Sequence, residues 1–317
     1  MTAIILINWN GADDTLACLA SLEQASGDFC VVVADNGSTD DSVSRLQEYV
    51  ATSPLCVHLL PLDRNWGFAA GNNRAISYAV KTFDLDSILL LNNDTEVAPD
   101  FMIKLQEYRA AHPSCKVMGP LICYWAEKDR IWSCGGRLVF GSRKSYYRDA
   151  DVSSLPERTP LPVSFISGCA LFADISLLDA DGRLLTERFF FGEEDYEFAL
   201  RMRRAGEKMV ILRDAVIWHK VASSARRAQT RSTLGRDYLY YLGRLIAARD
   251  YYSPMAFFVI RLISAGSSLR WFLRDGLTMR QSFRLARRLF RDARIREGIT
   301  YDDFQSTVID GTFFSTM

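Results

Sequence analysis

The stretch ILLLNNDTEVAPDF (residues 88–101) joins a strand-like apolar run to a polar end. Residues 88–91 have the composition of a strand that is buried on both faces, and Asn92, Asn93 and Asp94 follow directly. Divalent cations that bridge phosphates prefer oxygen ligands and take few of them from the protein, so Asp94 is a candidate metal ligand. The alternative is structural, namely that this segment turns the chain or caps the next helix.

Similar apolar runs alternate with helical patterns over the first third of the chain. Strands are predicted at residues 4–9, 30–34, 57–60 and 88–91, and helices at residues 15–22, 41–50, 71–83 and 99–110. Later segments predict a strand at residues 163–173 that is interrupted by Ser167 and Gly168, a helix at 195–205 and a strand at 209–218. This alternation predicts an α/β fold with a mostly parallel sheet flanked by helices, in which ligands bind beyond the carboxyl ends of the strands.

The charges divide the chain near residue 220. From Lys220 onward there are 17 Lys and Arg against 8 Asp and Glu, which leaves 21 against 30 in the preceding residues. We expect an acidic, metal-using domain over residues 1–220 and a basic helical extension over residues 221–317 that faces something anionic. The longest apolar stretch, residues 254–273, contains two arginines and is a poor candidate for a membrane-spanning helix.

The seven cysteines are scattered and never spaced as CxxC. They are predicted to be reduced core residues of a cytoplasmic protein, without a zinc site. The N-terminal sequence MTAIILINWNG has no basic segment before its apolar run, which predicts that it is not a signal peptide.

Polar residues at several predicted strand ends should converge on one crevice. Asp35 ends the second strand, where a carboxylate can accept the imide N–H of uracil or thymine, although DNGS is also an ordinary turn sequence. The loop NWGFAAGNN (residues 65–73) has two glycines that allow close approach of a ligand, although ordinary helix starts look similar. The candidate ligand-binding residues are Asn8, Trp9, Asn10, Asp35, Asn36, Gly37, Asn65, Gly67, Phe68, Gly71, Asn72, Asn92 and Asn93.

Two later segments add titratable groups. FFFGEEDYEFALRMRRAG (residues 189–206) places Asp195 in the first turn of a helix, where it is a candidate general base, while Glu193 is expected to be solvated. VIWHK ends a strand with His219. A lone histidine is more often structural than a ligand, but here it follows an acidic helix and an acidic crevice.

In this order the motifs resemble those of the family 2 glycosyltransferases, with the bacterial rhamnosyltransferase and galactofuranosyltransferase branch as the most similar. The resemblance covers about residues 3–220. It implies a GT-A fold, a nucleotide-sugar donor, a divalent metal (Mg²⁺ or Mn²⁺) and inversion at the anomeric carbon.

The resemblance also implies a role for individual residues. Asp35 corresponds to the residue that reads the pyrimidine, Asp94 to the last residue of the DxD-type metal motif, Asp195 to the catalytic base and His219 to a metal ligand found in part of the family. Many relatives have an acidic first residue or a proline at residues 92–93, so here only Asp94 is a charged ligand of that motif. Gly135, Gly136, Gly168 and Glu194 are predicted to lie on the side of the site where the acceptor binds.

The predicted function is therefore that of an inverting, metal-dependent hexosyltransferase. Our best prediction is transfer of rhamnose from dTDP-rhamnose, with a UDP-sugar as the other option, to a growing cell-surface glycan or a lipid-linked saccharide. A sugar nucleotidyltransferase is one alternative, but LINWNGADDTL lacks the basic, glycine-rich signature usual near the N-terminus of those enzymes. A non-catalytic sugar-nucleotide-binding protein is the other alternative, and it would not need Asp195.

The basic extension contains an amphipathic pattern over residues 278–296. Its apolar stripe is Met279, Phe283, Ala286, Phe290 and Ala293, and a stripe of arginines lies one residue further on. This pattern predicts peripheral attachment to the inner face of the cytoplasmic membrane. The alternative is that the stripe packs on the rest of the chain or on a second subunit of a homodimer. No motif for reading nucleic acid accompanies the charge, so nucleic acid is not an expected partner.

Overall fold

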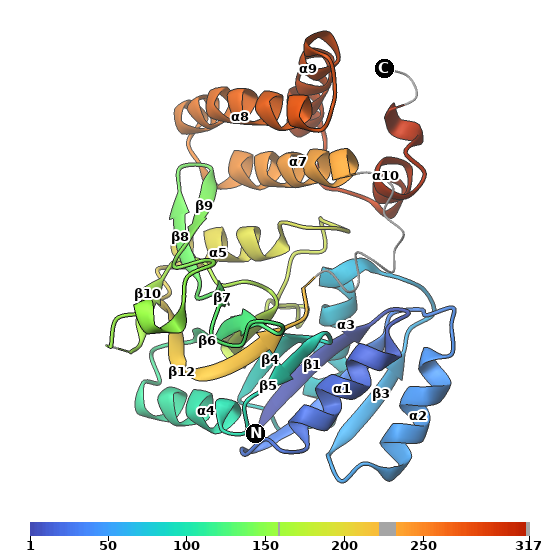
Figure 1. Ribbon diagram of the computed structural model, residues 1–317, viewed down its shortest axis with the longest axis vertical. Coiled ribbons are helices and arrows are strands. Elements are labelled where there is room, and N and C mark those ends of the chain that lie inside the picture. The colour runs from blue at the N-terminus through green and yellow to red at the C-terminus, as the bar shows by residue number, and fades with distance from the viewer. Residues whose placement is uncertain (158, 222–232, 315–317) are drawn as a thin grey trace.

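The structure is a computed structural model that describes residues 1–157, 159–221 and 233–314. A large sheet with helices on its faces forms one end of the molecule, and the C-terminal helices are stacked at the other end (Figure 1). The strands of the sheet are β1 (Thr2–Asn8), β2 (Phe29–Asp35), β3 (Val57–Pro61), β4 (Ser87–Asn92), β5 (Thr95–Val97), β6 (Val117–Tyr124), β7 (Ile131–Ser133), β10 (Leu161–Val163), β11 (Ala170–Asp174) and β12 (Met209–His219).

The main path through the sheet runs β10-β12-β6-β11-β4-β1-β2-β3, with β5 paired to β12 and β7 to β6. Strands β3, β2, β1 and β4 are parallel, and β12 is parallel to β6, whereas β11 is antiparallel to both of its neighbours. The register aligns Asn8 with Asp35 and Ile7 with Asn92, so the polar strand ends meet at one edge. This confirms the predicted α/β fold with a mostly parallel sheet.

The single interrupted strand predicted at residues 163–173 is wrong. The chain forms two strands there, and they occupy different places: β10 pairs with β12 at the edge of the sheet, and β11 lies between β4 and β6. The break falls at Ser167 and Gly168, which line the cavity described below. A separate hairpin consists of β8 (Gly136–Val139) and β9 (Ser142–Ser145).

Both faces of the sheet are covered by helices, namely α1 (Ala12–Leu22), α2 (Ser42–Thr52), α3 (Gly67–Thr82), α4 (Phe101–Ala111) and α5 (Glu194–Ala205). Ile4 and Leu6 belong to one apolar cluster, which includes residues of α1 and α4, whereas Ile5 belongs to a second cluster with residues of α3 and α5. Successive residues of a strand point to opposite faces, so burial on both sides explains why these strands are apolar throughout.

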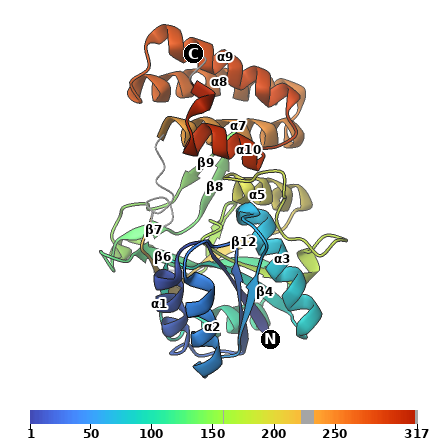
Figure 2. The same ribbon diagram turned by 90° about the vertical axis from the view of Figure 1, so that its right-hand side faces the viewer.

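The C-terminal helices are α7 (Thr233–Tyr251), α8 (Pro254–Arg274), α9 (Met279–Ile295) and α10 (Tyr301–Phe304). Figures 1 and 2 show α7 between α5 and α8. Tyr196 and Leu200 of α5 share a third apolar cluster with residues of α7, α8 and α9. The helical extension therefore shares a core with the sheet domain. The division at residue 220 stays a prediction, and the segment that follows it, residues 222–232, lies outside the described residues.

The predicted amphipathic helix is present as α9, and its buried face overlaps the predicted apolar stripe only in part. The helix begins with a capping box made by Thr278 and Gln281. Leu285 and Leu289 are fully buried, whereas Phe283 remains 58% exposed. Ala286 and Ala293 of the predicted stripe are buried as well, so the stripe lies partly in the core and partly toward solvent. Its contact with a membrane stays a prediction.

Candidate active site

A cavity of about 460 Å³ lies at the polar edge of the sheet. The ends of β4 and β12 contribute Asn92, Asp94 and His219, and the start of α3 contributes Gly67 and Phe68. The turn before β11 and the start of α5 complete the lining from the other side. Its place beyond the carboxyl ends of parallel strands agrees with the expected position for a ligand of an α/β sheet.

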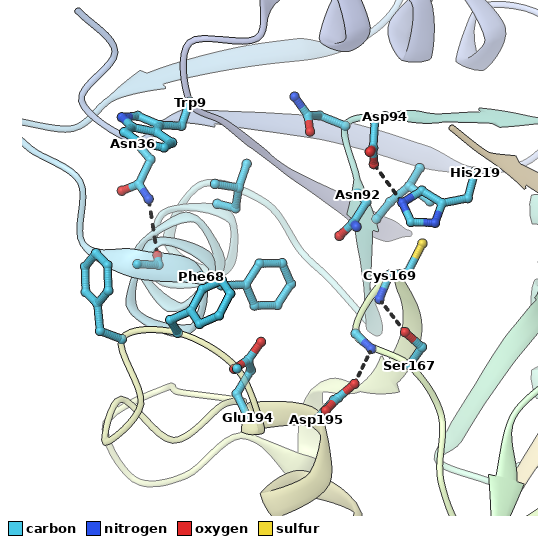
Figure 3. Close-up of a pocket in the computed structure, with 18 of the residues that line it drawn as sticks. Trp9, Asn36, Phe68, Asn92, Asp94, Ser167, Cys169, Glu194, Asp195 and His219 are labelled. Atoms are coloured by element: carbon cyan, nitrogen blue, oxygen red, sulfur yellow. Dashed lines mark hydrogen bonds and ion pairs between the residues drawn. The ribbon is translucent and has the colours of Figure 1, made fainter. Parts of the chain in front are cut away.

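Asp94 and His219 form a buried pair at one end of the cavity (Figure 3). The His219 Nε2 and Asp94 Oδ1 atoms are 3.0 Å apart, and the two residues are 6% and 4% exposed, respectively. β5, which pairs with β12, aligns Thr95 with His219 and so brings the end of β4 beside the end of β12. The ring of Trp132 meets the imidazole edge-on at 4.5 Å between centroids, which fixes the ring's position.

The surroundings of His219 favour the protonated ring. Burial by itself lowers the pKa of His219, but the nearby Cys169 sulfur and the Asp94 carboxylate raise it more, to about 10. Metal binding to histidine requires the neutral ring, so a cation at this pair would compete with a proton on His219.

The Asp94 and His219 side chains fit a divalent cation as a pair of ligands. Two ligand atoms about 2.1 Å from an octahedral cation lie about 3.0 Å apart when they are at right angles. Among the described residues, no group of three or more His, Cys, Asp or Glu side chains could hold a metal ion. A cation at this pair would therefore depend on further ligands from a bound diphosphate, from amide oxygens or from water.

Glu194 and Asp195 lie at the opposite end of the cavity, in the first turn of α5 (Figure 3). The Gly168 amide donates to Asp195 Oδ2 at 3.4 Å. Burial raises the pKa of Asp195, with Glu193 adding to the effect and Arg143 opposing it. Burial and the Asp195 charge raise the pKa of Glu194 to about 8. Two adjacent carboxyl groups with raised pKa values are typical of acid–base sites.

Glu193 is fully buried, so the expectation that it is solvated is wrong. Its two carboxylate oxygens accept from Arg143 Nη1 at 2.7 Å and from Arg244 Nη2 at 3.0 Å. The residue adopts a left-handed conformation (φ 69°) directly before α5. It ties the hairpin and α7 to the turn that presents Glu194 and Asp195 to the cavity.

A chain of buried hydrogen bonds connects three strand ends. Asn93 Nδ2 donates to Thr15 Oγ1, which donates to Asn8 Oδ1, and Asn8 Nδ2 donates to Asp35 Oδ2. These contacts are 2.7 to 2.8 Å long. Asp35 also accepts from the amide and the hydroxyl of Ser38. The network fixes the ends of β4, β1 and β2 relative to one another.

Two glycines allow the backbone to close around the cavity. Gly37 (φ +73°) leaves only 2.4 Å between the position of an added Cβ and the Arg64 backbone, and at Gly67 (φ +81°) the nearest atom, the Phe190 carbonyl oxygen, would be 2.5 Å away. Any other residue would be strained at both positions. Asn36 Nδ2 donates to Asn65 Oδ1 and to the Gly67 carbonyl, which joins the second strand end to the start of α3.

Many of the predicted site residues line the cavity. Those that line it are Trp9, Asn36, Asn65, Gly67, Phe68, Asn92, Asn93, Asp94, Gly168, Glu194, Asp195 and His219. Those outside its lining are Asn8, Asn10, Asp35, Gly37, Gly71, Asn72, Gly135 and Gly136. Asn8 and Asp35 support the lining from beneath through the network above, whereas Gly135 and Gly136 lie against Phe165 and the β9 strand.

The sequence analysis missed several lining residues. They are aromatic or basic residues from the turn before α5 and from the C-terminal helices: Phe190, Phe191, Arg236, Tyr240 and Phe304. Their rings contact one another, with Phe191 5.0 Å from Phe304 and 5.7 Å from Tyr240 between centroids. The run FFFGEED was the available signal, since three aromatic residues beside the predicted base indicate an apolar wall there.

Comparison with known proteins identifies relatives of this chain. A family-wide profile described as Glycosyl transferase family 2 matches residues 3–160. The uncharacterized glycosyltransferase YfnE of Bacillus subtilis is 24% identical over 257 residues, which is 69% of this chain and 64% of that protein. The low-salt glycan biosynthesis hexosyltransferase Agl10 of Haloferax volcanii is 26% identical over 208 residues, 64% of this chain and 61% of that protein. The matches thus span less than two thirds of either relative.

Solved structures share the fold at low sequence identity. The mannosyltransferase PcManGT from Pyrobaculum calidifontis, in complex with GDP-Man and Mn²⁺, has a TM-score of 0.56 at 16% identity, covering 100% of this chain and 80% of that one. S. aureus TarS 1-349 in complex with UDP-GlcNAc has a TM-score of 0.50 at 16% identity, covering 92% and 72%. These likenesses confirm the predicted GT-A fold. Residues 3–160, just under half of the chain, are thus similar to glycosyl transferase family 2, and the fold agrees with that similarity.

Proposed function

We propose that this protein is an inverting, metal-dependent glycosyltransferase that moves a hexose from a nucleoside-diphosphate sugar to an acceptor hydroxyl. The observation that carries the proposal is the arrangement of one cavity, with the Asp94–His219 pair at one end and the Glu194–Asp195 pair at the other (Figure 3). The match of residues 3–160 to the family 2 model, the similarity to a hexosyltransferase and the sugar nucleotides bound by the structural neighbours support it.

The Asp94–His219 end suits the diphosphate of the donor. A divalent cation held there would neutralise the charge that develops on the leaving diphosphate. The two side chains are close enough to become neighbouring ligands, provided that the hydrogen bond between them opens and both turn toward the cation. Asn92, which is partly exposed at the end of β4, adds an amide oxygen beside them.

Asp195 is the proposed general base that removes the proton from the acceptor hydroxyl. A carboxylate whose pKa is raised by burial is a stronger base than an exposed one, and the Gly168 amide helps to orient it. The base and the cation pair lie at opposite ends of the cavity, which is the arrangement that a single in-line displacement needs. Such a displacement inverts the anomeric carbon.

The aromatic lining of the cavity would shield the transferred sugar from water. Phe68 lies on the side of Glu194 in Figure 3, and Phe190 and Phe191, in the turn before α5, also line the cavity. Rings at this position exclude water, which would otherwise compete with the acceptor as a nucleophile.

The proposal also names a class of donor and a class of acceptor. dTDP-rhamnose remains our preferred donor and a UDP-sugar the second option, because Asp35 can accept a pyrimidine imide N–H if it exchanges one of its present contacts with Asn8 or Ser38. The proposed acceptor is a hydroxyl of a cell-surface glycan or of a lipid-linked saccharide.

A panel of nucleotide sugars tests the proposal. Each is added with Mn²⁺ or Mg²⁺ while the thermal midpoint is measured; a ligand at 100 times its Kd stabilises by about 2.7 kcal/mol. We expect one dTDP- or UDP-sugar to stabilise the protein in a metal-dependent way and to be hydrolysed slowly without acceptor, releasing the nucleoside diphosphate. Binding without any hydrolysis or transfer would favour the sugar-nucleotide-binding protein, and release of pyrophosphate from a nucleoside triphosphate and a sugar phosphate would favour the nucleotidyltransferase.

A further inference from the structure

Helix α8 has its apolar side turned outward. Large apolar side chains that are 39% to 80% exposed follow one another along it: Met255, Phe258, Val259, Leu262 and Ile263. The side of α8 that is buried against α7 and α9 includes two serines, Ser264 and Ser268. A helix on the surface of a soluble protein normally has the opposite pattern, with its apolar stripe facing the core.

The exposed residues of α8 form a single stripe. Their steps of three and four residues place them on one face of the helix, and exposed Gly266 and Arg270 continue that face. Soluble monomers rarely expose a continuous apolar surface of this kind, and such surfaces mark contact with a protein or with a membrane. Small residues such as Ser264 and Ser268 allow close helix packing, which is common among helices that meet lipid.

Basic residues of α9 lie beside this stripe. Arg261 of α8 lies 5.6 Å over the Phe290 ring, and together with α9 arginines it lines a hollow of about 760 Å³. Between residues 276 and 296 the sequence has one acidic residue, Asp292, which is buried and pairs with Arg288 and Arg291. In the described part of the chain, Arg287 and Arg294 form no ion pair with an acidic side chain.

We propose that α8 and α9 form a docking surface for an anionic lipid bilayer. The α8 stripe would enter the boundary between the head groups and the acyl chains, and the α9 arginines would contact lipid phosphates, which guanidinium groups bind in a bidentate manner. The association of an apolar stripe with excess positive charge favours lipid over an electrically neutral protein partner. This assigns the insertion to α8, whereas the sequence pattern had assigned it to α9.

Helix α8 lies in the plane of the bilayer in this proposal. The sequence analysis judged this stretch a poor candidate for a membrane-spanning helix because of its two arginines, but at 21 residues α8 is long and apolar enough to cross a membrane by length and composition alone. However, Ile260 and Phe272 are almost completely buried in the cluster that α8 shares with α7 and α9. Crossing the bilayer would remove these side chains from their core, whereas lying in the interface leaves the packing intact.

Flotation of the full chain with vesicles tests the docking surface. Vesicles of phosphatidylcholine alone are compared with vesicles that also contain phosphatidylglycerol, at low and at high salt. We expect the protein to float with the anionic vesicles at low salt and to dissociate as salt is raised, because salt screens the arginine charges. A folded chain that stays at the bottom with anionic vesicles at low salt overturns the proposal.

Matched variants separate the two parts of the surface. Phe258→Glu with Leu262→Glu charges the apolar stripe, and Arg287→Glu with Arg294→Glu reverses the basic band. Each arginine near an anionic surface contributes about fivefold to partitioning, so loss of both should weaken it by about 25-fold or more. Val80→Glu and Lys81→Glu, on the exposed side of α3, introduce comparable charge changes far from α8 and should leave flotation unchanged.

The oligomeric state tests whether a second copy of the chain, rather than lipid, covers this surface. Sedimentation of the wild type and of the Phe258/Leu262 variant reports whether a second copy covers α8. A monomer that floats supports the proposal, and a dimer that the variant dissociates, without flotation of the wild type, overturns it. The arginine variant leaves the buried face of α8 intact, so it keeps the test valid if the stripe variant fails to fold. Failure of this test leaves the proposed glycosyl transfer untouched, since donor hydrolysis is measured without vesicles.

Discussion

Replacing Glu193 with Gln is expected to destabilise the protein strongly. The side chain is 0% exposed, and its partners Arg143 and Arg244 are 23% and 22% exposed, so the change leaves two largely buried guanidinium groups without their counter-charge. Removing one partner from a buried charge pair costs about 3–5 kcal/mol, and Gln keeps the volume and one acceptor oxygen, which places the expected loss near 3 kcal/mol.

Urea unfolding followed by circular dichroism measures this loss. The control is Glu127→Gln, because Glu127 and Arg130 form an ion pair between side chains that are 57% and 44% exposed. An exposed pair of this kind contributes about 0–1 kcal/mol. A Glu193→Gln variant whose free energy of unfolding stays within about 1 kcal/mol of wild type would refute the argument that this carboxylate holds the turn before α5.

The effect of Glu193 should also depend on pH. Burial raises its pKa, but Arg143 and Arg244 lower it more, so the net shift is downward from 4.5. A group whose pKa is lowered by folding stabilises the protein above its unfolded pKa and loses that contribution as the pH falls through the folded value. The stability difference between wild type and Glu193→Gln should therefore be full at neutral pH and should shrink below about pH 4.5. A difference that grows on acidification would contradict the assigned sign.

Four further outcomes test the site. Asp195→Asn is expected to lower transfer by about 10² to 10⁴ while leaving donor affinity in calorimetry near wild type, and transfer within a few-fold of wild type would rule out its role as the base. Asp94→Ala and treatment with EDTA should each abolish activity, so full turnover in chelator would contradict a metal at the His219 pair. Asp35→Ala should weaken nucleoside diphosphate binding by roughly 1–3 kcal/mol, and an unchanged Kd would argue against contact with the base. The acidic limb of kcat/KM should lie above pH 3.8, because burial raises the pKa of Asp195 and a base acts only when ionised; a limb at or below that pH would contradict the assignment.

The fold could be predicted because its signals are local. Residues 88–91 are apolar throughout since helices cover both faces of the sheet, and the polar residues that follow mark where the strand leaves the core. Parallel strands bring such ends to one edge, and the resemblance to the family 2 glycosyltransferases implied that Asp94 and His219 share a metal site although 125 positions separate them.

Other parts of the site depend on contacts that no local pattern records. Glu193 belongs to an acidic run that is typical of an exposed helix start, and its partners Arg143 and Arg244 are 50 and 51 positions away. The neighbour that covers α9 is another such contact. Leu285 and Leu289 of this helix pack in a core that also contains Tyr196, and the sequence of α9 alone does not show that neighbour.

Helix α7 connects the cavity to the proposed lipid surface. It supplies Tyr240 to the cavity wall and Arg244 to Glu193, while Leu242 and Ile246 enter the core that holds α8 and α9. Deleting residues 221–317 would therefore remove the Arg244 partner of Glu193 as well as the membrane surface. Loss of vesicle binding in such a truncation could not be assigned to either cause. Point changes on the outer faces of α8 and α9 keep this core, so they alone can separate attachment to lipid from the integrity of the turn that carries Asp195.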